Sequence, residues 1–92
     1  MNVTYKHAPA QVGKYRVLLD QVNTRLKDHL GTLADRATAE WDRVEEGGGS
    51  VYILRVSMGG RWETAWFTRN ELESMNVAEP LLRLVQQLSA GQ

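Results

Sequence analysis

The 92-residue chain carries 11 Lys or Arg and 11 Asp or Glu, so its formal net charge at pH 7 is zero and it lacks the overall positive field that draws proteins to nucleic acids or anionic membranes. Its length favours a single domain, and a hydrophobic fraction of 42% with three Trp favours a folded chain over a disordered one. The chain has no cysteine, which excludes disulfides, thiolate catalysis and cysteine-ligated zinc.

The first helix is predicted to begin near Pro9. Residues 1–8 are expected to form an extended or disordered N-terminal tail, and residues 9–92 a single α+β domain. Apolar side chains then recur at steps of three and four residues, as on one face of a helix: Val12, Tyr15, Leu19, Val22, Leu26 and Leu30. Gly31 is the predicted end of this helix, because glycine tolerates the left-handed conformation that closes many helices.

The segment after Gly31 supports two interpretations. Leu33, Ala37, Trp41 and Val44 continue the helical spacing, so residues 36–46 could extend the first helix. Residues 37–42 also alternate small or apolar side chains with polar ones, which is the pattern of a strand. We favour the strand, because a Gly-Thr pair interrupts the helical pattern at residues 31–32.

Two further strands are predicted over residues 51–56 and 62–67, which are rich in β-branched and aromatic side chains. The pairs Gly47-Gly48 and Gly59-Gly60 separate the strands. Both central residues of a type I′ turn need a positive φ, so each glycine pair predicts a tight hairpin.

The last third of the chain contains two helix starts. Thr68 and Glu71 match a capping box, and Asn76 precedes a second helical segment with Pro80 in its first turn. The apolar face of that segment is formed by Leu81, Leu84, Val85 and Leu88, and Gly91 lies just past its end. The predicted fold is therefore α+β, in the order α-β-β-β-α, with a three-stranded antiparallel meander and two helices packed on one face.

The glycine turns set the register of the sheet and so assign each side chain to a face. The face predicted to form the core carries Ala39, Trp41, Tyr52, Leu54, Val56, Ala65 and Phe67. The opposite face carries Glu40, Asp42, Val44, Val51, Ile53, Arg55, Trp62, Thr64 and Trp66. Two helices are enough to cover only one of these faces, so the second is expected to meet water or a partner.

No motif indicates a catalytic, metal or cofactor site. The glycine pairs precede strands and lack the lysine of a phosphate-binding loop, and His7 and His29 have no metal-ligand spacing. The carboxylates of residues 45–46, Glu71 and Glu73 are explained by loops and helix capping, and no serine lies in a nucleophile-elbow pattern. We therefore expect no enzymatic activity, no metal and no cofactor.

The residues expected to bind a partner are Trp62, Trp66, Ile53 and Arg55, which share the second face. Three interpretations of the tryptophans remain open. They are core residues if the register is shifted by one, an exposed face shielded by long side chains, or a partner surface, since Trp is enriched in both cores and interfaces. Arg55 is predicted to lie between Glu40 and Thr64 and to form a cross-strand ion pair with Glu40.

Over residues 18–88, the order of elements resembles the layout of a double-stranded RNA-binding domain. In that family, a lysine-rich start of the last helix grips phosphates. The corresponding residues 68–73 here contain one basic and two acidic side chains, and the loop at residues 45–50 lacks the Gly-Pro-x-His type of sequence found in the family. The resemblance thus implies a fold, and we do not expect nucleic acid to be the main partner.

The favoured function is a small, non-enzymatic protein-interaction module that forms a homodimer through the apolar sheet face or an edge strand. We expect it in the cytoplasm and away from membranes, because the chain has no secretory signal and no stretch of about 18 apolar residues. The alternative is a nucleic-acid-binding domain with a degenerate version of the RNA-binding layout. It would use local arginines: Arg36, Arg43, Arg55, Arg61 and Arg69.

Overall fold

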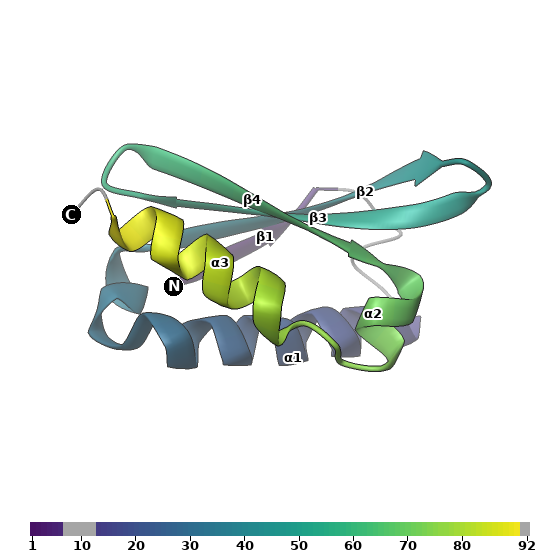
Figure 1. Cartoon of the computed structure of the whole chain (residues 1–92), viewed down its shortest axis with the longest axis horizontal. Coiled ribbons are helices and arrows are strands. Elements are labelled where there is room, and N and C mark those ends of the chain that lie inside the picture. The colour runs from purple at the N-terminus through teal and green to yellow at the C-terminus, as the bar shows by residue number, and fades with distance from the viewer. Residues whose placement is uncertain (7–12, 91–92) are drawn as a thin grey trace.

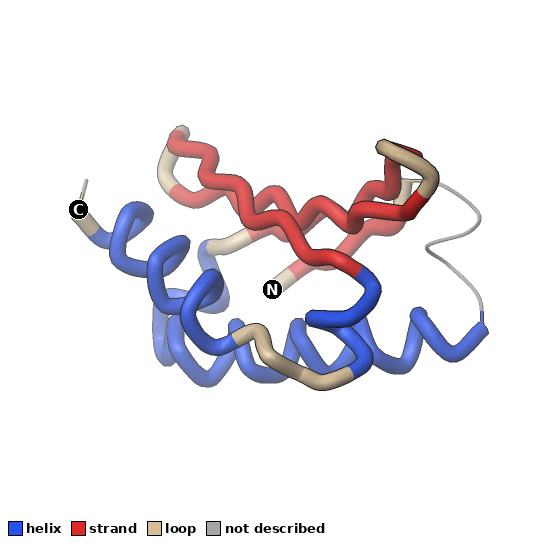
Figure 2. Tube along the Cα trace, turned by 45° about the vertical axis from the view of Figure 1, so that its right-hand side comes forward, coloured by secondary structure: helices blue, strands red, loops and turns tan. Residues whose placement is uncertain are grey.

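The computed structural model describes residues 1–6 and 13–90 of the chain. Four strands and three α-helices lie within these residues: β1 (Asn2–Tyr5), α1 (Gly13–Leu30), β2 (Thr38–Glu46), β3 (Gly49–Met58), β4 (Arg61–Thr68), α2 (Arg69–Glu73) and α3 (Ala78–Ser89), with a short 3-10 helix, η2 (Gly31–Arg36), between α1 and β2. The strands form one sheet, and all the helices lie on the same side of it (Figures 1 and 2). The predicted α+β class is confirmed.

The sheet has four strands in the order β1-β2-β3-β4, and it is mixed. β1 runs parallel to β2, with Val3 beside Ala39 and Tyr5 beside Trp41. The prediction of a three-stranded antiparallel meander, with residues 1–8 as a tail, is therefore wrong over Asn2–Tyr5. A four-residue strand gives little periodicity, and its partner lies more than thirty positions along the chain. Residues 7–8, the expected helix start at Pro9, and Gly91 lie outside the described residues.

Both hairpins have the predicted register. Trp41 pairs with Leu54, and Leu54 pairs in turn with Ala65. The turn glycines have φ values of 58° and 80° at Gly47 and Gly48, and of 59° and 83° at Gly59 and Gly60. Residues with side chains rarely adopt this left-handed region, which explains why each turn is a glycine pair.

The first helix ends at Leu30 as predicted, and Gly31 follows with a φ of 59°. The helical continuation through residues 36–46 is wrong, because the chain is extended from Thr38 onward in β2. The sequence analysis did not predict η2, which fills the six residues between the end of α1 and Ala37. Its first residue is the left-handed Gly31, so the chain leaves the axis of α1 before turning toward the sheet.

The predicted capping box is present at the end of β4. The Glu71 backbone N–H donates to Thr68 Oγ1 at 3.2 Å, and the Thr68 N–H donates to Glu71 Oε1 at 2.8 Å. This cap starts α2, which is a separate short helix, so the structure has one α-helix more than the two predicted. Met75, with a φ of 54°, lies between α2 and α3, and Pro80 sits in the first turn of α3.

The predicted core face of the sheet is buried against the helices. Trp41, Leu54 and Phe67 have no exposed surface, and the other predicted members are also buried. The helices contribute Leu19 and Leu26 from α1 and Leu84 from α3 to the same core. The register derived from the glycine turns thus identifies the core face correctly.

A chain of hydrogen bonds runs from the core to the surface and ties α1 to both β2 and β1. The indole N–H of the buried Trp41 donates to Asn23 Oδ1 at 2.7 Å, and Asn23 Nδ2 donates to the Tyr5 hydroxyl at 3.0 Å. That hydroxyl donates to Asp20 Oδ1 at 2.5 Å, and the Arg16 guanidinium lies 3.7 Å from the centre of the Tyr5 ring. A buried indole N–H needs a partner, so this network sets where α1 and β1 lie relative to β2.

Replacement of Gly60 by Ala is expected to lower the free energy of unfolding by about 1–2 kcal/mol, measured by chemical denaturation. No atom of the described residues lies within 4 Å of an added Cβ, so the loss comes from the positive φ. Gly60→Asn is the matched control and should lose less, since asparagine tolerates this conformation. Equal stability of the wild type and the alanine variant would contradict the turn geometry.

Tyr5→Phe is expected to lower the free energy of unfolding by about 1 kcal/mol, because it removes two hydrogen bonds from the network. Burial and the hydrogen bond to Asp20 raise the pKa of Tyr5 above 10.0. The stability that the protonated Tyr5 hydroxyl contributes is therefore fully present below about pH 10, and it is lost as the pH rises through the raised pKa. Denaturation at a series of alkaline pH values should show a steeper loss in the wild type than in Tyr5→Phe, and parallel curves would exclude this role.

Candidate functional site

The face of the sheet turned away from the helices carries the two exposed tryptophans. Trp62 and Trp66 both belong to β4, and 56% and 53% of their surfaces are exposed. None of the described helices covers this face (Figures 1 and 2). We call it the open face, and it consists of the side chains that alternate with the buried ones along the strands. The interpretation of Trp62 and Trp66 as core residues is wrong.

The four-residue spacing of the two tryptophans places them on one face of β4, with Thr64 between them. Trp62 pairs with Ser57, and Trp66 pairs with Ile53 on β3. Ile53 lies on the open face as predicted, but only 8% of its surface is exposed. The exposed apolar surface of the predicted site therefore comes from the tryptophans.

Arg55 lies at the centre of the open face, between Glu40 on β2 and Thr64 on β4. Its guanidinium is 3.6 Å from the Glu40 carboxylate, so the predicted cross-strand ion pair is confirmed. Both side chains are partly exposed, so this pair adds little to stability. The Glu40 carboxylate therefore balances the charge of Arg55 on the same face of the sheet as the two apolar tryptophans.

Within residues 1–6 and 13–90, no strand neighbours the outer edge of β4. Met58 and Arg61 flank the two-residue turn and form a hydrogen-bonded pair in this type of hairpin. Hydrogen-bonded and non-hydrogen-bonded pairs alternate along an antiparallel ladder. The backbone N–H and C=O groups of Trp62, Thr64 and Trp66 therefore point away from β3. Among the described residues, no other segment donates a backbone hydrogen bond to these groups or accepts one from them.

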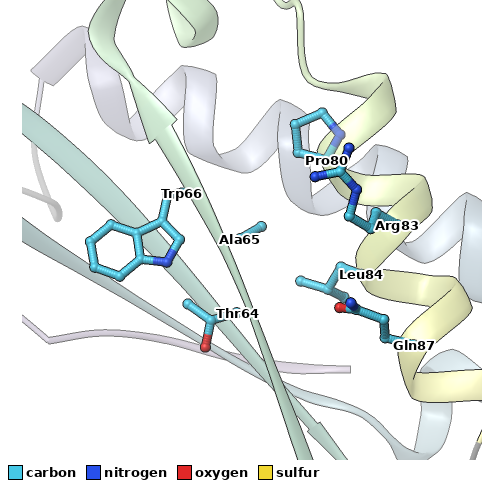
Figure 3. A pocket seen from close by; sticks show the side chains of 7 residues that line it. All are labelled: Thr64, Ala65, Trp66, Pro80, Arg83, Leu84 and Gln87. Carbon is cyan, nitrogen blue, oxygen red and sulfur yellow. The ribbon is translucent and has the colours of Figure 1, made fainter.

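A cavity of about 230 Å³ lies between this edge of β4 and α3. It is lined by Thr64, Ala65, Trp66, Pro80, Arg83, Leu84 and Gln87. Ala65 and Leu84 point toward each other across the gap, and Trp66 and Thr64 project from the opposite side of β4 (Figure 3). We call this cavity the β4–α3 groove. Sequence analysis did not find it, and the only signal was the recurrence of Pro80, Arg83 and Gln87 along one flank of a helix.

The arginines proposed as alternative nucleic-acid ligands are spread over the molecule, and most contact an acidic or aromatic side chain. Arg43 contacts Glu45 at 2.5 Å, and Arg61 contacts Glu63 at 3.8 Å. Arg69 donates to the Tyr15 hydroxyl at 2.9 Å, an interaction that raises the pKa of Arg69. Arg36 is exposed on η2. Arg43 and Arg61 thus lie beside carboxylates, and Arg69 lies beside a phenol.

The described residues contain no group of three or more His, Asp or Glu side chains placed to hold a metal ion. His29 is exposed near the end of α1, and His7 lies outside the described residues. In the part of the chain that the structure describes, no helix combines the length and apolar character needed to cross a membrane.

The fold is a mixed α+β fold with a four-stranded sheet and three helices, and it has a counterpart among solved structures. The crystal structure of the Thermus thermophilus Protein Y N-terminal domain matches 99% of this chain and 94% of its own, with a TM-score of 0.54 and 15% sequence identity. At this identity the similarity shows the fold alone. No protein-family model matches the chain, and no curated protein matches it.

Proposed function

We propose that this protein is a small, non-enzymatic protein-interaction module that self-associates through its open face. The proposal rests on the exposure of Trp62 and Trp66, on either side of Thr64. They lie on a face of the sheet that no described helix covers (Figure 1). Tryptophan is the side chain with the largest apolar surface, and it is enriched in protein interfaces. Two such residues on one exposed strand indicate a surface that is more stable when covered.

A second copy is the partner that this geometry favours. Two sheets pack face to face at about 10 Å, the arrangement of β-sandwiches, and a two-fold axis would bring the open faces of two copies together. Arg55 and Glu40 already neutralise each other at the centre of this face. Their pairing lowers the cost of removing the face from water, because neither charge would be buried alone.

Light scattering across a dilution series tests this proposal. The wild type should show twice the monomer mass at high concentration and approach the monomer mass on dilution. The Trp62→Ser/Trp66→Ser variant should keep the monomer mass throughout, with an unchanged circular dichroism spectrum, because both side chains are more than half exposed and outside the core. Association should also persist in concentrated salt, whereas binding to phosphates would weaken steeply.

The matched control is Val17→Ser/Leu82→Ser, which also replaces two exposed apolar residues but on the helices. Val17 is 57% exposed and Leu82 is 46% exposed. This variant should associate like the wild type. Monomer mass of the wild type at all concentrations, or equal loss of association in both double variants, would contradict self-association through the open face.

A further inference from the structure

The β4–α3 groove combines a free strand edge with the flank of a helix (Figure 3). Its volume of about 230 Å³ is below the roughly 300–1,000 Å³ of typical small-molecule pockets. Ala65 and Leu84 face each other across it and give it an apolar floor. The groove therefore has room for side chains of a polypeptide and is too small for a typical drug-sized ligand.

The backbone of β4 supplies the hydrogen-bonding half of the groove. The N–H and C=O groups of Thr64 and Trp66 point outward along it, because these residues occupy the non-hydrogen-bonded positions opposite β3. Outward groups on an edge strand are satisfied by water or by a further strand, and strand addition is a common mode of peptide recognition. These groups therefore select a chain in extended conformation.

The position of α3 disfavours a second copy on this edge. Antiparallel pairing of β4 with β4 of another copy about a two-fold axis would keep both helical layers on the same side of the joined sheet. The paired strands would be about 4.8 Å apart, and α3 packs directly against β4 in each copy. Packed helices need about 8–10 Å between their axes, so two α3 helices lying beneath strands at that spacing would crowd each other. A segment without its own helix avoids this crowding.

Arg83 gives the groove its charge preference. It is the ionisable residue among the described residues that line the groove, and the other lining side chains are neutral. Its guanidinium lies 3.1 Å from Glu79 Oε1, one turn earlier on α3, with 67% of the Arg83 side chain and 83% of the Glu79 side chain exposed. An exposed pair of this kind is weak, so Arg83 is able to turn to a carboxylate in the groove while Glu79 remains in water.

We infer that the β4–α3 groove binds an extended peptide segment of a partner protein, which adds a fifth strand beside β4 and places a carboxylate against Arg83. Alternate side chains of such a segment point to the same face. One apolar side chain lies over Ala65 and Leu84, and an acidic side chain two positions away reaches Arg83. This inference goes beyond self-association, because it uses the edge of β4, whereas self-association uses the open face. Trp66 contributes to both surfaces.

The test uses a fluorescent, acetylated and amidated peptide of about six residues, the usual strand length, that alternates Thr and Val and has Glu at one Val position. Binding is measured by fluorescence anisotropy at a protein concentration at which light scattering shows monomers. Two matched peptides serve as controls: one has Lys in place of Glu, and the other carries N-methyl groups on alternate amides, so that it cannot pair with β4.

The Glu peptide is expected to bind more tightly than the Lys peptide, and the N-methylated peptide is expected not to bind. Arg83→Gln should weaken binding of the Glu peptide by about three- to fivefold, as expected for an exposed ion pair. The control Arg25→Gln, which changes an exposed arginine on α1, should have no effect. Thr64→Pro should abolish binding, since it removes an outward N–H at an edge position where proline is tolerated.

Three results would overturn the inference. Equal binding of the N-methylated peptide would exclude strand addition, and equal binding of the Glu and Lys peptides would exclude the role of Arg83. If no peptide binds and Thr64→Pro instead converts a dimer into monomers, the edge is occupied by a second copy. The peptide controls decide the question even if Thr64→Pro fails to fold, because they leave the protein unchanged.

Discussion

Two glycine pairs with positive φ set the register of the sheet in this protein. Gly47-Gly48 and Gly59-Gly60 make two-residue turns that leave no freedom in the pairing of β2, β3 and β4. A slip of one residue would turn every side chain to the other face. Phe67 would then be exposed and Trp66 buried, so the same turns determine both the core and the surface offered to a partner.

The central part of the fold could be predicted because its signals are local. A glycine pair between two β-branched runs specifies a hairpin within about twenty residues, and the capping box at Thr68 and Glu71 lies within a single turn. These local signals predict the register. Because side chains alternate between the two faces of a strand, the register also predicts the buried face and the exposure of Trp62 and Trp66. The Arg55–Glu40 ion pair followed from the same register, because the two residues are direct cross-strand partners.

The features that sequence analysis missed depend on contacts between distant segments. β1 is only four residues long, and its pairing with β2 needs α1 as the crossover between them. The Tyr5 hydroxyl of β1 accepts a hydrogen bond from Asn23 on α1, and Asn23 in turn accepts one from the indole of Trp41 on β2. The β4–α3 groove likewise exists only because α3 returns along the strand that precedes it. Periodicity within one segment contains no information about such contacts.

β4 presents three surfaces with different roles: its inner side chains, its outer side chains and its backbone edge. Its inner side chains, Ala65 and Phe67, belong to the core, and its outer ones, Trp62 and Trp66, form the apolar part of the open face. Its third side is the free backbone edge beside α3. The open face and the edge select different occupants, because a face is covered by another folded surface and an edge is extended by another strand. Both proposals therefore require the same register, and the groove also requires that the outer edge of β4 be unpaired.

Amide hydrogen exchange along β4, measured residue by residue by nuclear magnetic resonance on the monomer, tests that requirement most directly. Exchange rates are expected to alternate along the strand. The outward amides of Trp62, Thr64 and Trp66 should exchange rapidly, and the amides of Glu63, Ala65 and Phe67, which bond to β3, should exchange slowly. Uniform protection along the strand would show that the edge is already covered. Alternation in the opposite phase would show that the register is shifted by one residue, and it would contradict both the assigned core and the proposed surfaces.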